Sequence, residues 1–142
     1  MSQYILDTDC VTLFQHFHPE IAKRAKAIGH SNIFITTVTL QEQLQGRLAV
    51  MNKANAKHPD RLAIAHRNLQ ATLIYYCNVN LLPFDDAAYF HYQNLRQQKI
   101  RIGTNDLIIA AIALTHQAIL VTKNQKDFNK VPDLSIEDWT LA

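Results

Sequence analysis

Carboxylate side chains stand directly after predicted strands or at the starts of predicted helices. Asp7 and Asp9 follow the apolar run Tyr4-Ile5-Leu6, Glu42 lies in the first turn after a second apolar run, and Asp106 opens an apolar helix. The crevice outside the carboxyl ends of parallel strands is where open α/β sheets bind ligands, so acids distant in sequence can meet there. Carboxylates gathered at one point repel one another unless a cation lies among them, and oxygen ligands without His or Cys suit Mg²⁺ or Mn²⁺. We therefore predict a hard-metal site formed by Asp7, Glu42 and Asp106.

A fourth segment also ends at this predicted edge. Asn124 and Asp127 follow the apolar run Ile119–Thr122, and we count both as candidate catalytic residues. The sequence does not decide whether Asn124, Asp127 or Asp9 completes the site.

Each acid also has a purely structural interpretation. The residues Thr39-Leu40-Gln41-Glu42 form a capping-box pattern, in which Glu42 would bond back to the Thr39 amide. Asp106 could be a first-turn acid favoured by the helix dipole, and Asp9 could be a helix N-cap. No turn or capping role is obvious for Asp7, which follows a buried strand. This difference favours the metal site.

The elements that would position these acids alternate between strands and helices. Short apolar runs predict strands at residues 4–6, 33–35, 79–82 and 119–122, with a weak last strand near residues 134–136. A helix beginning near Asp106 is apolar all round through Leu114, so we expect it to be buried. Alternation without hairpin signals predicts one three-layer α/β/α domain spanning residues 1–142, with a central parallel sheet and the first strand near its centre.

Two longer helices in the middle of the chain repeat an apolar residue at helical spacing. The first opens at Thr39 and carries Leu40, Leu44, Leu48 and Met51; the second carries Leu62, Ala65, Leu69, Leu73 and Tyr76. The polar break at residues 55–60 contains Pro59, so we expect an antiparallel hairpin packed along these faces. These helices carry more apolar side chains than one sheet face can cover, among them Leu40, Leu48, Leu69 and Leu73. The excess predicts a homodimer.

Composition bounds the class of protein. The chain has 142 residues, of which 48% are hydrophobic and 18% charged, and its longest apolar run is far too short to span a bilayer. Cys10 and Cys77 lack the neighbours of a metal site, so we expect both to be small hydrophobic residues in a reduced, cytoplasmic protein. Three glycines and no glycine-rich phosphate motif argue against a nucleotide cofactor.

Positive charge is distributed unevenly, although the net charge is only +2. Basic residues crowd the middle of the chain and a later segment, which is compatible with a polyanionic partner. They are Arg47, Lys53, Lys57, His58, Arg61, His66, Arg67, Arg96, Lys99 and Arg101. Solvated faces of amphipathic helices would explain any single one of them equally well.

Four blocks of the sequence together resemble the PIN-domain ribonucleases of the VapC toxin type. They are Ile5-Leu6-Asp7-Thr8-Asp9, Thr36-Thr37-Val38-Thr39-Leu40-Gln41-Glu42-Gln43-Leu44-Gln45-Gly46, Ile102-Gly103-Thr104-Asn105-Asp106-Leu107-Ile108-Ile109-Ala110-Ala111, and Leu120-Val121-Thr122-Lys123-Asn124-Gln125-Lys126-Asp127-Phe128. The resemblance implies Mg²⁺- or Mn²⁺-dependent cleavage of RNA, a homodimer and a cognate antitoxin in the active-site groove. Asp9 and Gln43 depart from the usual residues of the family, and neither departure removes a metal ligand.

Two other functions compete with this interpretation. The segment from Ile5 to Val11 also fits the nucleophile signature of haloacid-dehalogenase-type phosphohydrolases, in which Asp7 would form an aspartyl-phosphate. That family needs a lysine before its last acidic block, whereas Lys123 follows Asp106 here. A catalytically silent module that binds RNA or protein through its basic helices is the second alternative.

Overall fold

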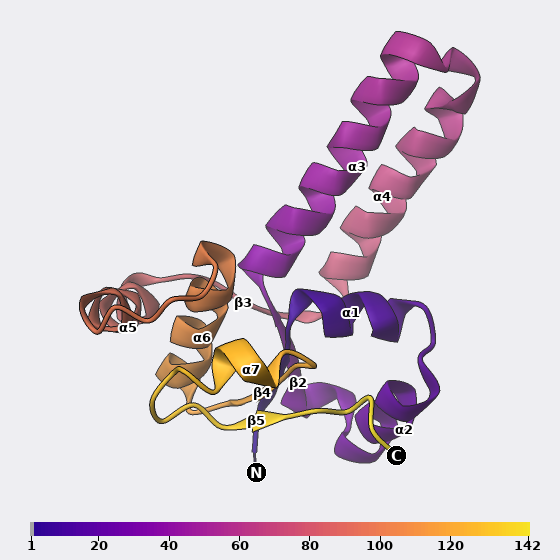
Figure 1. The fold of residues 1–142 in the computed structure, drawn as a ribbon. Coiled ribbons are helices and arrows are strands. Elements are labelled where there is room, and N and C mark those ends of the chain that lie inside the picture. Colours follow the sequence, from indigo (N-terminus) through magenta and orange to yellow (C-terminus); the bar gives the residue numbers. More distant parts are fainter. Residues whose placement is uncertain (1) are drawn as a thin grey trace.

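The computed structural model describes residues 2–142, and a parallel sheet runs through its centre (Figure 1). The strands are β1 (Tyr4–Leu6), β2 (Ile33–Thr36), β3 (Asn80–Leu82), β4 (Ile119–Val121) and β5 (Ile136–Glu137). They lie in the order β3-β2-β1-β4-β5, and every adjacent pair is parallel. This confirms the predicted parallel sheet and the central position of the first strand.

Helices cover both faces of the sheet because successive strand residues point to opposite sides. Ile5 and Leu120 pack on one face with α5 (Asp86–Gln97), α6 (Thr104–His116) and α7 (Gln125–Phe128). Leu6 and Val121 pack on the other face with α1 (Thr8–Gln15) and α2 (Pro19–Ile28). The α/β/α layers are therefore confirmed.

Helix α6 lies within the first of these cores. Residues 109–113 are all buried, as expected of a helix without a polar face. It begins two residues earlier than predicted, at Thr104, so Asp106 lies in its first turn rather than at its start.

The two long helices form an arm that extends away from the sheet (Figure 1). Helix α3 (Thr37–Lys57) and helix α4 (Leu62–Cys77) are joined at His58 and a short 3₁₀ helix, Pro59–Arg61. The predicted hairpin is confirmed, and α3 begins two residues before the predicted Thr39.

The two helices of the arm do not pack along all of the apolar positions that the sequence predicts for their contact. Ala54 and Ala65 are both only 4% exposed, and Arg47 Nε donates a hydrogen bond to Thr72 Oγ1 at 3.0 Å. Leu48 and Leu73 remain 48% and 60% exposed, so the expectation that they pack between the helices is wrong. The arm is only two helices thick, so each helix keeps a side toward solvent.

Glycine, capping and core residues define several of the element ends. Gly29 follows α2 with φ of 95°, a conformation that glycine adopts without strain. Asp85 caps α5 by accepting a hydrogen bond from the Ala88 amide, and Trp139 is fully buried against the core. Cys10 is buried as expected, whereas Cys77 is exposed at the end of α4 and is not a core residue. No helix found within residues 2–142 combines the length and hydropathy needed to cross a bilayer.

Candidate active site

Asp7 occupies the one-residue connection between β1 and α1. Its Oδ1 accepts a hydrogen bond from the Cys10 amide at 2.9 Å, and its Oδ2 accepts one from Thr122 Oγ1 at 2.6 Å. Asp7 is therefore the N-cap of α1, and the expectation that it has no capping role is wrong. β1 ends at Leu6 and α1 begins at Thr8, which leaves Asp7 alone to cap the helix.

Burial dominates the electrostatics of this carboxyl group. The side chain of Asp7 is 6% exposed, and desolvation raises its pKa, although the hydrogen bonds from Thr122 and Cys10 partly oppose that rise. Its ionised form is thus costly without a nearby positive charge. Asp9, an exposed residue in the first turn of α1, is not the N-cap suggested by the sequence, because Asp7 holds that position.

Glu42 lies in α3 and turns toward α1. Thr8 Oγ1 donates a hydrogen bond to Glu42 Oε1 at 3.1 Å, and the Thr8 and Thr39 hydroxyls are 2.9 Å apart. The capping-box interpretation is wrong because α3 begins at Thr37, which places Thr39 inside the helix. Glu42 is held beside the end of β1 instead.

Asp106 lies close enough to the other acids for their charges to affect its pKa. Partial burial raises its pKa first, and the negative charges of Asp7, Glu42, Asp127 and Asp9 raise it further, to about 6. Acids from four segments that are far apart in sequence therefore interact electrostatically at this edge of the sheet, where they form a shared negative field. Among residues 2–142, however, no three His, Cys, Asp or Glu side chains lie close enough together to form a ready-made metal cage.

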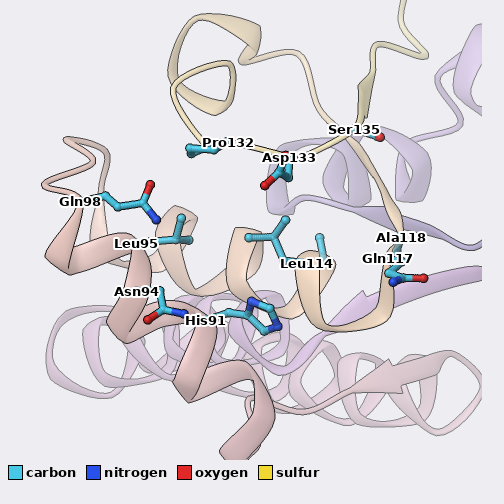
Figure 2. Close-up of a pocket in the computed structure, with 11 residues that line it drawn as sticks. His91, Asn94, Leu95, Gln98, Leu114, Gln117, Ala118, Pro132, Asp133 and Ser135 are labelled. Atoms are coloured by element: carbon cyan, nitrogen blue, oxygen red, sulfur yellow. The ribbon is translucent and has the colours of Figure 1, made fainter.

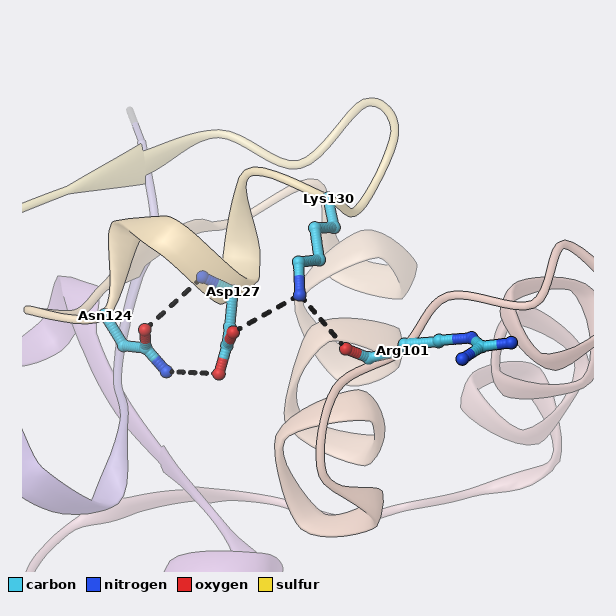
Figure 3. Close-up of polar contacts among 4 residues, drawn as sticks. All are labelled: Arg101, Asn124, Asp127 and Lys130. Carbon is cyan, nitrogen blue, oxygen red and sulfur yellow. Dashed lines mark hydrogen bonds and ion pairs between the residues drawn. The ribbon is translucent and has the colours of Figure 1, made fainter.

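Asn124 and Asp127 bind each other in the turn after β4 (Figure 3). Asn124 Nδ2 donates to Asp127 Oδ2 at 2.9 Å, and the Asp127 amide donates back to Asn124 Oδ1 at 3.3 Å. Lys130 Nζ lies 3.6 Å from Asp127 Oδ1 and donates to the Arg101 carbonyl oxygen at 3.3 Å. The hydrogen bond from Asn124 lowers the pKa of Asp127. These contacts tie the β4 turn to the segment that precedes α6.

Thr122 links two of these segments and was not singled out from the sequence. Its fully buried hydroxyl donates to Asp7 Oδ2 and accepts a hydrogen bond from the Asn124 amide at 2.9 Å. A hydroxyl directly after an apolar strand was the available signal, but its partner lies 115 residues away. Only the sheet order brings them together.

A separate cavity of about 440 Å³ lies between α5, α6 and the loop before β5 (Figure 2). His91, Asn94 and Gln98 line one side, and Gln117, Asp133 and Ser135 line the other. Gln117 and Asp106 are at opposite ends of α6, about 16 Å apart along the helix axis. This cavity is therefore distinct from the carboxylate edge.

Known proteins share both the sequence pattern and the fold of this chain. It is 29% identical to Ribonuclease VapC2 of Rickettsia felis over 96% of its own length and 97% of that protein. It is 25% identical to the tRNA(fMet)-specific endonuclease VapC of Salmonella typhimurium, over 98% of this chain and 99% of the relative.

The structure is similar to that of VapBC-1 from nontypeable Haemophilus influenzae. The TM-score is 0.74, with 28% sequence identity over 97% of this chain and 98% of the other. This likeness and the sequence relatives favour the PIN interpretation over a haloacid-dehalogenase fold. Residues 4–134 match the PIN domain family, and the chain therefore belongs to that family.

Proposed function

We propose that this protein is a divalent-metal-dependent endoribonuclease that hydrolyses RNA phosphodiester bonds and acts as the toxin of a toxin–antitoxin pair. The ribonuclease and tRNA endonuclease names of its VapC relatives support the activity. The observation that carries most weight is the shared field of Asp7, Glu42 and Asp106 at the carboxyl edge of the sheet. A purely structural set of acids gains nothing from this mutual repulsion.

The residues at this edge fit a hard cation. All three acids offer oxygen atoms, and burial together with like charge disfavours the ionised forms of Asp7 and Asp106 unless positive charge is supplied. Thr36, at the end of β2, has the single buried side-chain oxygen or nitrogen within residues 2–142 that lacks a hydrogen-bond partner. Mg²⁺ commonly binds through one or two carboxylates, with water and substrate phosphate as its other ligands, so a ready-made cage of three acids is not required.

Asp7, Glu42 and Asp106 would hold Mg²⁺ or Mn²⁺. The ion would activate a water molecule for attack on phosphorus and offset charge that develops on the phosphate. Thr122 and the Cys10 amide orient the carboxylate of Asp7, and Thr8 orients that of Glu42. Asn124 and Asp127 border the site and hold the β4 turn in place.

The exposed apolar surface of the arm supports a protein partner. Leu48, Val50, Ile64, Leu73 and Ile74 are each about half exposed or more, and large apolar patches mark interaction sites. We assign this surface to a homodimer contact. The likeness to VapBC-1 supports a cognate antitoxin as a second partner, and we place it in the groove at the active site. A cytoplasmic location follows from an RNA substrate and an antitoxin partner.

An RNA cleavage assay with purified protein tests the proposal. Wild-type protein should cleave bacterial tRNA in the presence of Mg²⁺ or Mn²⁺ and lose this activity in excess EDTA. Asp7→Asn and Asp106→Asn should abolish cleavage and still bind RNA, because Lys and Arg contacts to phosphates supply the affinity. Asp133→Asn is the matched control, since Asp133 lines the separate cavity and has φ of 66°, which Asn tolerates.

Cleavage that persists in EDTA, or in Asp7→Asn, would contradict the metal site. RNA binding without cleavage by the wild type under all metal conditions would instead favour the silent binding module.

A further inference from the structure

The charge of the chain is divided between the arm and the rest of the molecule. Residues 46–68, the outer part of the arm, contain five lysines and arginines and one acidic residue, a net charge of +4. The whole chain carries +2, so the remainder carries −2. The arm is thus a cationic projection on a mildly acidic body.

The positive groups of the arm are available to a partner. Lys53, Lys57, Arg61 and Arg67 are all exposed, while Arg47, also exposed, donates a hydrogen bond to Thr72 within the arm. The two ion pairs found within residues 2–142, Arg24–Glu137 and Asp127–Lys130, both lie outside the arm. Lys53 and Lys57 are one helical turn apart, a like-charge spacing that destabilises a helix. An external anion would relieve this repulsion.

The arm begins at the carboxylate edge. Helix α3 follows β2 without a loop, and Glu42 lies near its start. Lys57 is fifteen residues further along the helix, or about 22 Å at 1.5 Å per residue. Figure 1 shows the arm extending beyond the sheet from this point. A strand whose cleaved phosphate lies at the acids can therefore run along the arm.

From this arrangement we propose that the arm is a phosphate-binding extension of the active site, which selects folded or long RNA over short fragments. The inference rests on the proposed ribonuclease activity and adds a substrate class to it. At about 3.4 Å per stacked nucleotide, 22 Å corresponds to roughly six nucleotides beyond the cleaved bond. We favour RNA over an acidic protein as the bound anion. An RNA strand that is cleaved at the acids is repelled by them, and positive charge along the arm would offset that repulsion.

A triple variant of the arm tests the inference. Lys53→Gln, Lys57→Gln and Arg61→Gln together should lower kcat/KM for unfractionated bacterial tRNA by roughly tenfold to a hundredfold at about 0.1 M salt, given the loss of three phosphate contacts. The slope of log kcat/KM against log salt should become shallower by about two to three. Cleavage of a hexanucleotide that carries the cleavage site mapped on tRNA should match wild type.

Two further variants separate charge from folding. Lys23→Gln, Arg24→Gln and Lys26→Gln change exposed residues of α2, outside the arm, by the same total charge and should leave both activities as in wild type. Replacing Lys53 and Lys57 with Arg keeps the charge and should retain tRNA cleavage.

Each outcome has a distinct meaning. Equal loss in the arm variant and the matched control would overturn the inference in favour of a net-charge effect. Wild-type tRNA cleavage by the arm variant would also overturn it and assign the arm to an acidic protein partner. A wild-type protein that cleaves neither RNA would contradict the ribonuclease proposal itself.

Discussion

Replacing Asp106 with Asn should stabilise the metal-free protein at neutral pH. The pKa of Asp106 rises from its ordinary 3.8 to about 6 because the carboxyl group is partly buried among other acids. Each pKa unit corresponds to about 1.4 kcal/mol, so the full effect is about 3 kcal/mol. The group is only partly buried, and screening reduces this to roughly 1–2 kcal/mol. For a chain of this size the melting temperature should rise by about 3–8 °C.

The pH dependence follows from the sign of this change. Below about pH 3 the carboxyl group is largely protonated in both the folded and the unfolded states, so it has almost no effect on stability. As the pH rises from about 4 through 6, the unfolded chain releases the proton more readily than the folded protein does, and the wild type loses stability. Above that range the difference between wild type and Asp106→Asn stays constant.

Thermal melts at several pH values in EDTA and in Mn²⁺ measure both effects. In EDTA, the difference in melting temperature between Asp106→Asn and wild type should be near zero at about pH 3 and largest above pH 7. Mn²⁺ at a hundred times its dissociation constant should stabilise the wild type by about 2.7 kcal/mol and the variant much less. A variant no more stable than wild type at pH 7.5 in EDTA would refute the shared-field argument.

Three other changes test individual contacts. Asp7→Asn keeps an oxygen for the Cys10 amide, so in circular-dichroism melts it should unfold at or above wild type without metal, whereas Asp7→Ala loses the cap and about 1 kcal/mol. Thr122→Val leaves the buried Asp7 carboxylate and the partly buried Asn124 amide without this partner and should cost about 1–3 kcal/mol. The same change raises the pKa of Asp7, so the acidic limb of the pH–rate profile should move to higher pH, and Thr122→Ser should restore it. Light scattering should give a dimer for the wild type and a monomer for Leu48→Glu with Leu73→Glu; a wild-type monomer at micromolar concentration would contradict the dimer.

The parallel sheet and its alternation of strands with helices could be predicted because the sequence signals for them are local. Ile5 and Leu6 form a continuous apolar run, as a strand buried on both faces requires, and α6 has no polar face. The seam of the arm could not be predicted because Leu48 and Ala54 both fit an apolar helical position. Which of them is buried depends on how closely α4 approaches, and that is set by the tertiary structure.

The site was only partly predictable for a related reason. The positions of Asp7, Glu42 and Asp106 follow from strand ends and parallel topology, which sequence patterns specify. Two of these acids accept hydrogen bonds from hydroxyl groups, Asp7 from Thr122 and Glu42 from Thr8, and no sequence pattern marks either threonine as a partner. Contacts such as Thr122 to Asp7 cross nearly the whole chain and leave no periodic trace in the sequence.

Because Asp7 caps α1, its position alone does not distinguish it from a structural acid, and its burial as a carboxylate carries the argument for function. Asn or Ser would cap α1 about as well as Asp and would carry no charge into a buried position. Asp at position 7 instead brings a carboxylate whose raised pKa marks an unfavourable ionised state. Its two oxygens offer about four acceptor positions, of which the Cys10 and Thr122 hydrogen bonds use two. The helix N-terminus and these two hydrogen bonds favour the ionised form, but burial outweighs them. A bound cation, as proposed above, would offset the remaining cost of this charge.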